Sequence, residues 1–258
     1  MRLIVLGAAA GGGFPQWNCA CANCQRAWAG DPAAPARTQS ALAVSADGQR
    51  WLVLNASPDL RQQILRTPAL HPRGDAGLRD SPIAAVAVTN GDVDHTGGLI
   101  NLRESWPFGL YAHQRLHATL EANPVFGVLN PEVVARRALP LDTRTPIADG
   151  AGQEIGLSVE TFAVPGKVPL YQERARAQGD YTGEAGDTVA VQLIQHGNGA
   201  RVYYVPNCAA LDAATARRLE GADLVFFDGT LYQDDEMIAA GLGRKTGRRM
   251  GHMPVSGP

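Results

Sequence analysis

Short runs of apolar, often β-branched residues recur along the chain, separated by polar and turn-forming residues. Runs of about four to eight such residues are typical of strands. The predicted strands cover residues 2–7, 41–45, 51–55, 83–89, 109–112, 157–164, 189–195, 202–205 and 224–228. Turn-forming residues at Asp47-Gly48 and at 196–199 separate adjacent runs. The pattern therefore predicts several hairpins.

Helices are predicted in four places. The first opens at Ser57-Pro58, with serine as the N-cap and proline as the first helical residue, and continues to Leu65. The others cover the segment from just after His95 to Leu102, residues 114–121 and residues 211–219. Because hairpins come first and helices are interspersed later, we expect an α/β fold. It has two mixed sheets packed face to face, with helices outside, in a single domain over residues 1–258.

Two polar stretches, 141–152 and 173–186, are predicted to be surface loops. The second is rich in charged residues and is a candidate for a lid over a site.

Composition restricts the class of protein. The chain has 258 residues, of which 45% are hydrophobic and 19% are charged, as in ordinary globular proteins. A net charge of -2 without a basic run disfavours nucleic-acid binding. No apolar run reaches the roughly 18 residues of a membrane span. The apolar N-terminus could pass for a short signal peptide, but its β-branched start favours a buried strand, so we expect a cytoplasmic protein.

Three of the four cysteines, Cys19, Cys21 and Cys24, lie within six residues. This spacing favours a metal site over a disulfide framework. Thiolates suit Zn²⁺ in a closed, structural site, with the fourth ligand left open between Cys208 and a histidine. The alternative is three buried free thiols, a use that cysteine also has.

An acidic loop follows the buried run at 83–89. Asp92, Asp94 and His95 place two carboxylates and an imidazole at the end of a predicted strand. Such a set prefers a harder divalent metal such as iron or manganese, although zinc also fits. The alternative is an Asp-rich turn whose side chains cap the next helix.

The same loop resembles the metallo-β-lactamase signature His-x-His-x-Asp-His. The matching positions hold Asn90, Asp92, Asp94 and His95, so both leading histidines are replaced. Longer segments narrow the resemblance to the coenzyme PQQ synthesis protein B family. They are LGAAAGGGFPQWNCACANCQ (6–25), ARTQSALAVS (36–45), NASPDLRQQI (55–64), HTGGLINLRE (95–104), FFDGTLYQDDEM (226–237) and MGHMPVSGP (250–258).

The resemblance implies an αββα sandwich and a role in making pyrroloquinoline quinone (PQQ) from a ribosomal precursor peptide. Later metal ligands of the superfamily would fall near Gly166, Asn207 and Asp228, and only Asp228 could act as one. His252 occupies a loop that in related phosphodiesterases carries a proton-transfer histidine; the alternative is an exposed loop residue. The resemblance also implies a further strand with a His-Ile-Asn-Asn segment past Pro258, which is expected to be missing here.

Three functions are compatible with these residues. The resemblance implies an iron- and oxygen-dependent hydroxylase that acts on the tyrosine ring of a linked Glu–Tyr precursor, with Asp92, Asp94 and His95 holding Fe²⁺ and His252 moving protons. A metal-dependent hydrolase is disfavoured by the lost histidines. A carrier of PQQ or its precursor is the third. Expected partners are the precursor and other proteins of the PQQ pathway; the oligomeric state is left open.

Overall fold

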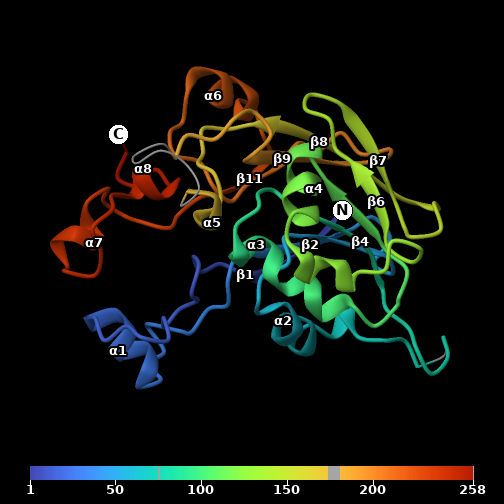
Figure 1. Ribbon diagram of the computed structural model, residues 1–258, viewed down its shortest axis with the longest axis horizontal. Helices are drawn as coiled ribbons and strands as arrows, with labels where there is room; N and C mark the ends of the chain where they lie inside the picture. The colour runs from blue at the N-terminus through green and yellow to red at the C-terminus, as the bar shows by residue number, and fades with distance from the viewer. Residues whose placement is uncertain (75, 174–180, 258) are drawn as a thin grey trace.

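The computed structural model describes residues 1–74, 76–173 and 181–257, and within them two β-sheets form the centre of the molecule (Figure 1). In these residues the first sheet has six strands in the order β1-β2-β3-β4-β5-β6. They are β1 (Arg2–Gly7), β2 (Ala41–Ser45), β3 (Trp51–Leu54), β4 (Ile83–Ala87), β5 (Gly109–Ala112) and β6 (Ala135–Ala138). Strands β1 to β3 pair antiparallel, and β3 to β6 pair parallel.

The second sheet has the order β11-β10-β9-β8-β7. Its strands are β7 (Arg144–Ala148), β8 (Glu154–Ala163), β9 (Val189–Gln195), β10 (Val202–Val205) and β11 (Leu224–Phe227). All neighbours are antiparallel except β10 and β11, which run parallel.

Helical segments cover the outer faces of the two sheets and lie in the connections between the strands. They are α1 (Ala22–Trp28), α2 (Leu60–Arg66), η1 (Pro68–Leu70), α3 (Val93–Thr96), η2 (Gly97–Leu102), α4 (Gln114–Glu121), η3 (Pro124–Val128), α5 (Leu170–Glu173), α6 (Ala213–Leu219), α7 (Glu236–Ala239) and α8 (Gly247–Met250). Among the residues described, none of these helices has the length and apolar character needed to cross a lipid bilayer.

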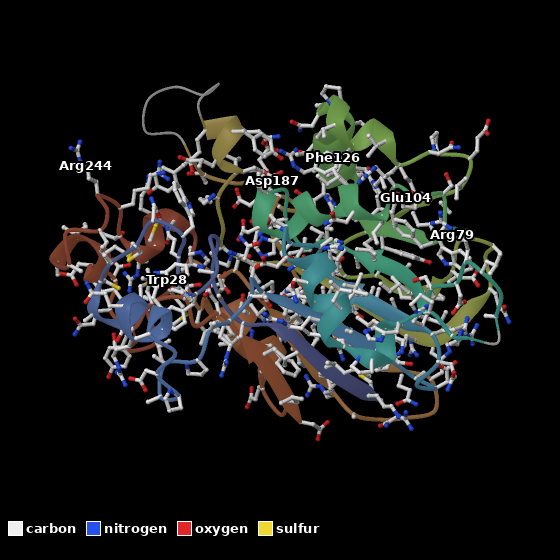
Figure 2. All side chains as sticks on the ribbon, turned by 90° about the horizontal axis from the view of Figure 1, so that it is seen from below. Trp28, Arg79, Glu104, Phe126, Asp187 and Arg244 are labelled. Atoms are coloured by element: carbon white, nitrogen blue, oxygen red, sulfur yellow. The ribbon has the colours of Figure 1, made fainter. Side chains whose placement is uncertain are left out.

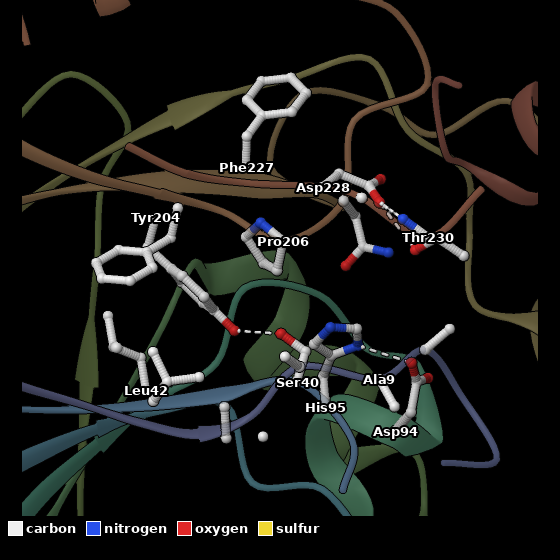
Figure 3. Close-up of a pocket in the computed structure, with 18 of the residues that line it drawn as sticks. Ala9, Ser40, Leu42, Asp94, His95, Tyr204, Pro206, Phe227, Asp228 and Thr230 are labelled. Atoms are coloured by element: carbon white, nitrogen blue, oxygen red, sulfur yellow. Dashed lines mark hydrogen bonds and ion pairs between the residues drawn. The ribbon is translucent and has the colours of Figure 1, made fainter. Parts of the chain in front are cut away.

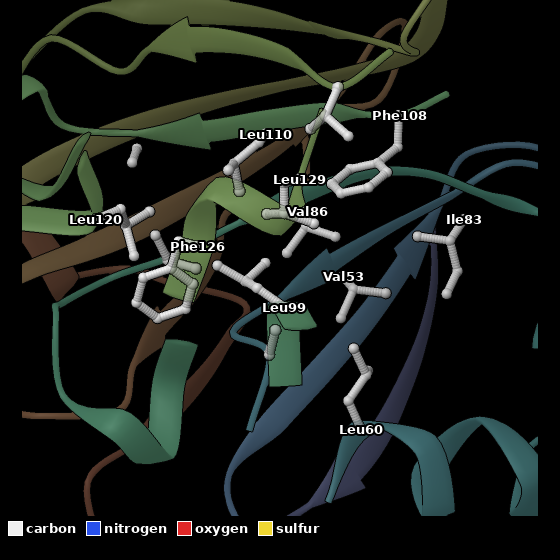
Figure 4. Close-up of a cluster of buried hydrophobic side chains, with 14 of the residues drawn as sticks. Val53, Leu60, Ile83, Val86, Leu99, Phe108, Leu110, Leu120, Phe126 and Leu129 are labelled. Atoms are coloured by element: carbon white, nitrogen blue, oxygen red, sulfur yellow. The ribbon is translucent and has the colours of Figure 1, made fainter. Parts of the chain in front are cut away.

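Successive side chains of a strand point to opposite faces of its sheet, and this places them in different layers of the molecule. Leu42 and Val44 of β2 pack between the sheets with Leu193 of β9, while Ala43 faces the opposite side. On that outer side, Leu99 and other buried residues from the helices cover the first sheet (Figure 4). Helix α6 contributes to a third cluster on the outer face of the second sheet. Because side chains on a strand alternate between faces, both sheets bury two apolar surfaces, and the expected αββα sandwich is confirmed.

All nine predicted strands are present, with ends that match or differ by at most three residues. Two strands escaped prediction. Residues 141–152 are not only a loop, because β7 lies within them and pairs with β8. Pro146 conceals this strand in the sequence, yet proline is compatible with an edge strand. Strand β6 reads ARRA, a charged edge strand without an apolar pattern.

The helices also differ in detail. Helix α4 has the predicted bounds, whereas α2 starts after Asp59 rather than at Ser57-Pro58. The segment beyond His95 is not an α-helix but the 3₁₀ helix η2. Gly98 in this segment lies against the chain before α2, since a Cβ there would clash with the carbonyl oxygen of Ser57. The predicted 211–219 helix begins at Ala213, with Asp212 as its N-cap. The short helices α1, α5, α7 and α8 were not predicted. Half of the proposed lid 173–186, residues 174–180, lies outside the described residues.

Candidate functional site

A pocket of about 370 Å³ opens where the two sheets meet at the carboxyl ends of β4, β10 and β11 (Figure 3). The loop after β4 supplies Asp94 and His95, and the chain after β11 supplies Asp228. Carboxyl ends of neighbouring parallel strands are where α/β sheets place their ligands. The sheets therefore bring residues more than a hundred positions apart to one cavity.

Asp94 and His95 form one wall of the pocket. His95 is 3% exposed, and its Nδ1 lies 3.5 Å from Asp94 Oδ2 without a hydrogen-bond partner among the described residues. Burial opposes ionisation of Asp94, but the adjacent imidazole outweighs it and lowers the pKa of Asp94 to about 2. Burial likewise opposes the charged form of His95, yet the Asp94 carboxylate raises the pKa of His95 above its ordinary value. With Nδ1 turned toward Asp94, Nε2 is the ring nitrogen left for a ligand.

Asp228 and His252 form the opposite wall. The Asp228 side chain is fully buried, and its Oδ2 accepts hydrogen bonds from His252 Nδ1 at 2.7 Å and from the Cys208 backbone N–H at 3.1 Å. Its Oδ1 accepts from the Thr230 backbone N–H and from the Thr230 hydroxyl. Four donors thus saturate the carboxylate, which makes Asp228 the partner that orients His252 in this structure rather than an open metal ligand.

Tyr204 closes the pocket from β10 and was not singled out by the sequence. Its hydroxyl lies 2.9 Å from Ser40 Oγ and accepts a hydrogen bond from Asn55 Nδ2 at 3.3 Å. Burial raises the pKa of Tyr204 to about 12, so the phenol stays protonated. Asn55 itself has φ 64°, a conformation that asparagine tolerates, and its Oδ1 accepts from the Thr89 N–H.

Asp92 does not join Asp94 and His95, contrary to the sequence-based expectation of a three-residue ligand set. Its Oδ2 lies 2.9 Å from Lys167 Nζ, and its Oδ1 accepts from the Leu170 backbone N–H at 3.0 Å. Lys167 Nζ also lies 3.8 Å from Glu173, which pairs with Lys245 and Arg249. The physical reason is the ion pair: Asp92 faces a cation of the segment before α5 and ties that segment to the loop after β4.

The three clustered cysteines meet at the start of α1. Their sulfur atoms lie within 4.8 Å of one another, and no fourth histidine, cysteine or acidic residue joins the group among the described residues. Cys21 is the N-cap of α1, and the Cys24 N–H donates to its sulfur, which lowers the pKa of Cys21. Burial raises the pKa of Cys24 to about 11. Trp28 of α1 projects from this edge of the molecule and is 60% exposed (Figure 2).

Cys208 and the remaining histidines lie outside both clusters of candidate ligands. Cys208 is buried and donates to the Ala210 carbonyl. His113 caps α4, His117 contacts the Arg137 carbonyl, and His196 contacts Ser158. These three histidines have hydrogen-bond partners within the fold, away from the candidate metal ligands.

The chain is similar to known proteins both in its domain and over its whole length. The beta-lactamase superfamily domain matches residues 50–257. The chain is 54% identical over 258 residues to coenzyme PQQ synthesis protein B of a Methylobacterium species, covering 100% of this chain and 82% of the relative. It is 54% identical over 256 residues to the Gluconacetobacter diazotrophicus protein of the same name, covering 99% of this chain and 81% of the relative.

Solved structures agree with the sequence relatives. Zinc-bound PqqB from Methylobacterium extorquens superposes with a TM-score of 0.91 and 48% identity, covering 100% of this chain and 82% of that one. A diphosphatase of the PhnP family reaches a TM-score of 0.64 at 20% identity, with 98% of this chain and 78% of that chain covered. The second likeness shows a shared fold alone.

Proposed function

The chain belongs to the coenzyme PQQ synthesis protein B family, within the β-lactamase superfamily, and from this premise we propose that it hydroxylates the tyrosine ring of a Glu–Tyr-derived precursor in PQQ biosynthesis. The observation that carries the proposal is the pocket between the sheets. There an Asp94–His95 pair faces an Asp228–His252 pair across a space of about 370 Å³. The first pair offers metal ligands, and the second offers a proton acceptor.

The donor atoms of Asp94 and His95 fit a divalent cation. A half-buried carboxylate and a buried imidazole whose Nδ1 has no hydrogen-bond partner among the described residues are the kinds of mixed ligands that ferrous iron takes in oxygen-using enzymes. These two residues would hold the metal, and bound Fe²⁺ would supply activation of dioxygen. Asp92 would act from outside, by fastening the segment before α5 through Lys167.

His252 would move the proton of the substrate phenol. A carboxylate only accepts hydrogen bonds, so Asp228 places the His252 proton on Nδ1. The neutral ring then carries its lone pair on Nε2, and His252 lines the pocket. A phenol that loses its proton becomes more electron-rich at the ring, which favours attack by an oxidant. Placing a general base in this way typically contributes about 10²–10⁴-fold.

Oxygen incorporation tests the proposal. Hydroxylation by O₂ places one oxygen atom on the ring in exchange for a hydrogen and releases the other as water, so it needs two electrons from a reductant. Full-length protein reconstituted with Fe²⁺ is incubated with the Glu–Tyr-derived precursor and ascorbate as the electron donor under ¹⁸O₂, and the product is analysed by mass spectrometry. We expect one labelled oxygen on the tyrosine ring, and none with the His95→Ala variant. Failure of iron-loaded wild-type protein to form hydroxylated product would refute the proposal.

Carriage of PQQ or its precursor is a second candidate, favoured by the small number of free ligands in the signature loop. Asn90 is neutral and Asp92 is ion-paired, so only Asp94 and His95 remain available. A carrier would keep tight PQQ binding after substitution of Asp92 and Asp94 by alanine, whereas the hydroxylase would lose turnover.

We also propose a structural zinc site at Cys19, Cys21 and Cys24. The mutual proximity of the three sulfur atoms supports it, as does the zinc reported for the 48% identical PqqB. Changing Cys19 and Cys21 to serine should lower the zinc content by about one ion per chain and leave active-site metal unchanged. Elemental analysis of purified full-length protein measures this. Cys208→Ser, which alters a buried thiol elsewhere, should keep its zinc; equal loss in both variants would contradict the assignment.

Metal binding at Asp94 and His95 should depend on pH. The pKa of His95 is raised above its ordinary 6.5, so the metal-free imidazole stays protonated to a higher pH than an ordinary histidine. A metal binds only the neutral ring, so the proton must leave. Apparent Fe²⁺ affinity should rise about tenfold per pH unit below the pKa of His95 and level off above it. Anaerobic titration calorimetry at several pH values measures the slope, and a flat profile from pH 6 to 8 would contradict it.

A further inference from the structure

Two asparagines lie between the pocket and the ion pair that Asp92 forms with Lys167. Asn90 follows β4 and Asn207 follows β10, and they are 4% and 8% exposed. Their side chains are joined by one hydrogen bond of 2.8 Å, from Asn90 Nδ2 to Asn207 Oδ1. Asn207 lines the pocket, and Asn90 lies behind it.

The orientation of both amides follows from a single fixed donor. The backbone N–H of Asp92 can only donate, and it lies 2.9 Å from the Asn90 side chain, so Oδ1 of Asn90 must face it. The NH₂ group of Asn90 then faces Asn207. Because that group only donates, Asn207 must turn its oxygen toward Asn90 and its own NH₂ group away from it.

The outward NH₂ group of Asn207 has no hydrogen-bond acceptor among the described residues, and solvent reaches it. Since Asn207 lines the pocket, its free N–H bonds are available to a bound molecule there. Its oxygen is already used, and an amide nitrogen is not a metal ligand at neutral pH. Asn207 is therefore suited to bind an acceptor oxygen and not a cation.

We propose that Asn207 is a substrate-positioning residue that donates a hydrogen bond to a carbonyl, phenolate or carboxylate oxygen of the ligand, and that Asn90 sets its polarity. The identity of the ligand as a PQQ-related compound rests on the proposed function. A neutral donor serves this purpose because the pocket already contains the carboxylates of Asp94 and Asp228, which repel an oxygen-rich ligand. The N–H bonds of Asn207 can attract the ligand, and the amide does not change its charge with pH.

The Asn90→Asp variant should reverse the direction of the Asn207 side-chain amide while residue 207 itself stays asparagine. In Asn90→Asp, one carboxylate oxygen still accepts from the Asp92 N–H, and the other accepts from Asn207. Asn207 must then rotate its NH₂ group toward residue 90 and present its oxygen to the pocket. The variant replaces a donor by an acceptor at the ligand.

Binding of PQQ to full-length protein, followed by titration calorimetry, is the measurement. We expect Asn207→Ala to weaken binding about 3- to 10-fold, and Asn90→Asp to weaken it by at least about as much. In the Asn207→Ala background, Asn90→Asp should add nothing, because there is no amide left to invert. Asn198→Asp, which alters an exposed turn residue that accepts from the Ala200 N–H, is the matched control and should bind as wild type.

Three results would overturn the proposal. They are wild-type affinity in Asn207→Ala, an equal effect of Asn90→Asp with and without Asn207, and no saturable PQQ binding by wild-type protein. The second would mean that the new charge acts on the ligand directly. Variants are accepted only if their amide NMR spectra show the folded protein, and Asn207→Ser replaces Asn207→Ala if that variant fails. Loss of the hydroxylase proposal would appear separately, as absence of hydroxylated product with PQQ binding intact.

Discussion

His95→Ala in full-length protein should abolish metal binding in the pocket and lower hydroxylation at least about 1,000-fold, because several kcal/mol of metal-assisted stabilisation correspond to that factor. The physical reason is the position of the ring. His95 is buried, and it supplies the one imidazole on the Asp94 side of the pocket among the described lining residues. Alanine there leaves the half-buried Asp94 carboxylate with no neighbouring nitrogen ligand.

Metal content and turnover are measured together for this variant. His71→Ala removes an exposed imidazole whose Nε2 lies 3.3 Å from the Leu65 carbonyl oxygen, and it should match wild type in both readouts. The cysteine-bound zinc should also be unchanged in His95→Ala, so total metal should fall without reaching zero. An unchanged iron stoichiometry in His95→Ala would place the metal elsewhere.

Asp228→Asn should lower turnover about 10²–10⁴-fold, the range spanned by general-base catalysis and by loss of the correct histidine tautomer in an Asp–His pair. The native carboxylate accepts from His252, Cys208 and Thr230. An amide can accept on its oxygen only. If the amide oxygen takes the place of Oδ1 and keeps the two Thr230 donors, the NH₂ group takes the place of Oδ2, where it faces His252 Nδ1 and the Cys208 N–H. It then moves the ring proton of His252 to Nε2, which removes the base from the pocket.

The tautomer of His252 tests this role of Asp228 specifically, because a loss of folding stability alone would not change it. Nitrogen-15 NMR of labelled histidine should place the proton of neutral His252 on Nδ1 in wild type and on Nε2 in Asp228→Asn, with iron affinity little changed. Asp212→Asn exchanges one good N-cap residue for another at α6 and should retain full turnover. Full activity in Asp228→Asn, or an unaltered tautomer with reduced activity, would exclude Asp228 as the residue that orients His252.

From the sequence alone, nine of the eleven described strands, the sandwich and the two groups of candidate ligands could be predicted. Short β-branched runs indicate strands because alternation and branching suit a pleated, buried surface, and β2, β5, β9 and β10 have the predicted bounds. The three cysteines could be found because their ligand spacing is local. Asp94 and His95 could be found for the same reason, since both lie in one short loop after a strand.

Tertiary structure decided the roles of residues whose partners are distant in the chain. Asp92 and Asp94 lie in the same loop, and nothing in the sequence distinguishes their roles. In the structure, Asp92 forms an ion pair with Lys167, whereas Asp94 lines the pocket. Asp228 and His252 are in contact because the fold places two separate segments of the chain side by side. Asn90 likewise contacts Asn207, although 117 positions separate them in the sequence. No local pattern encodes such pairs, because the direction of a side chain is set by the packing of two sheets and not by its neighbours in sequence. That packing turned one aspartate into an ion-pair partner and left the other facing the pocket.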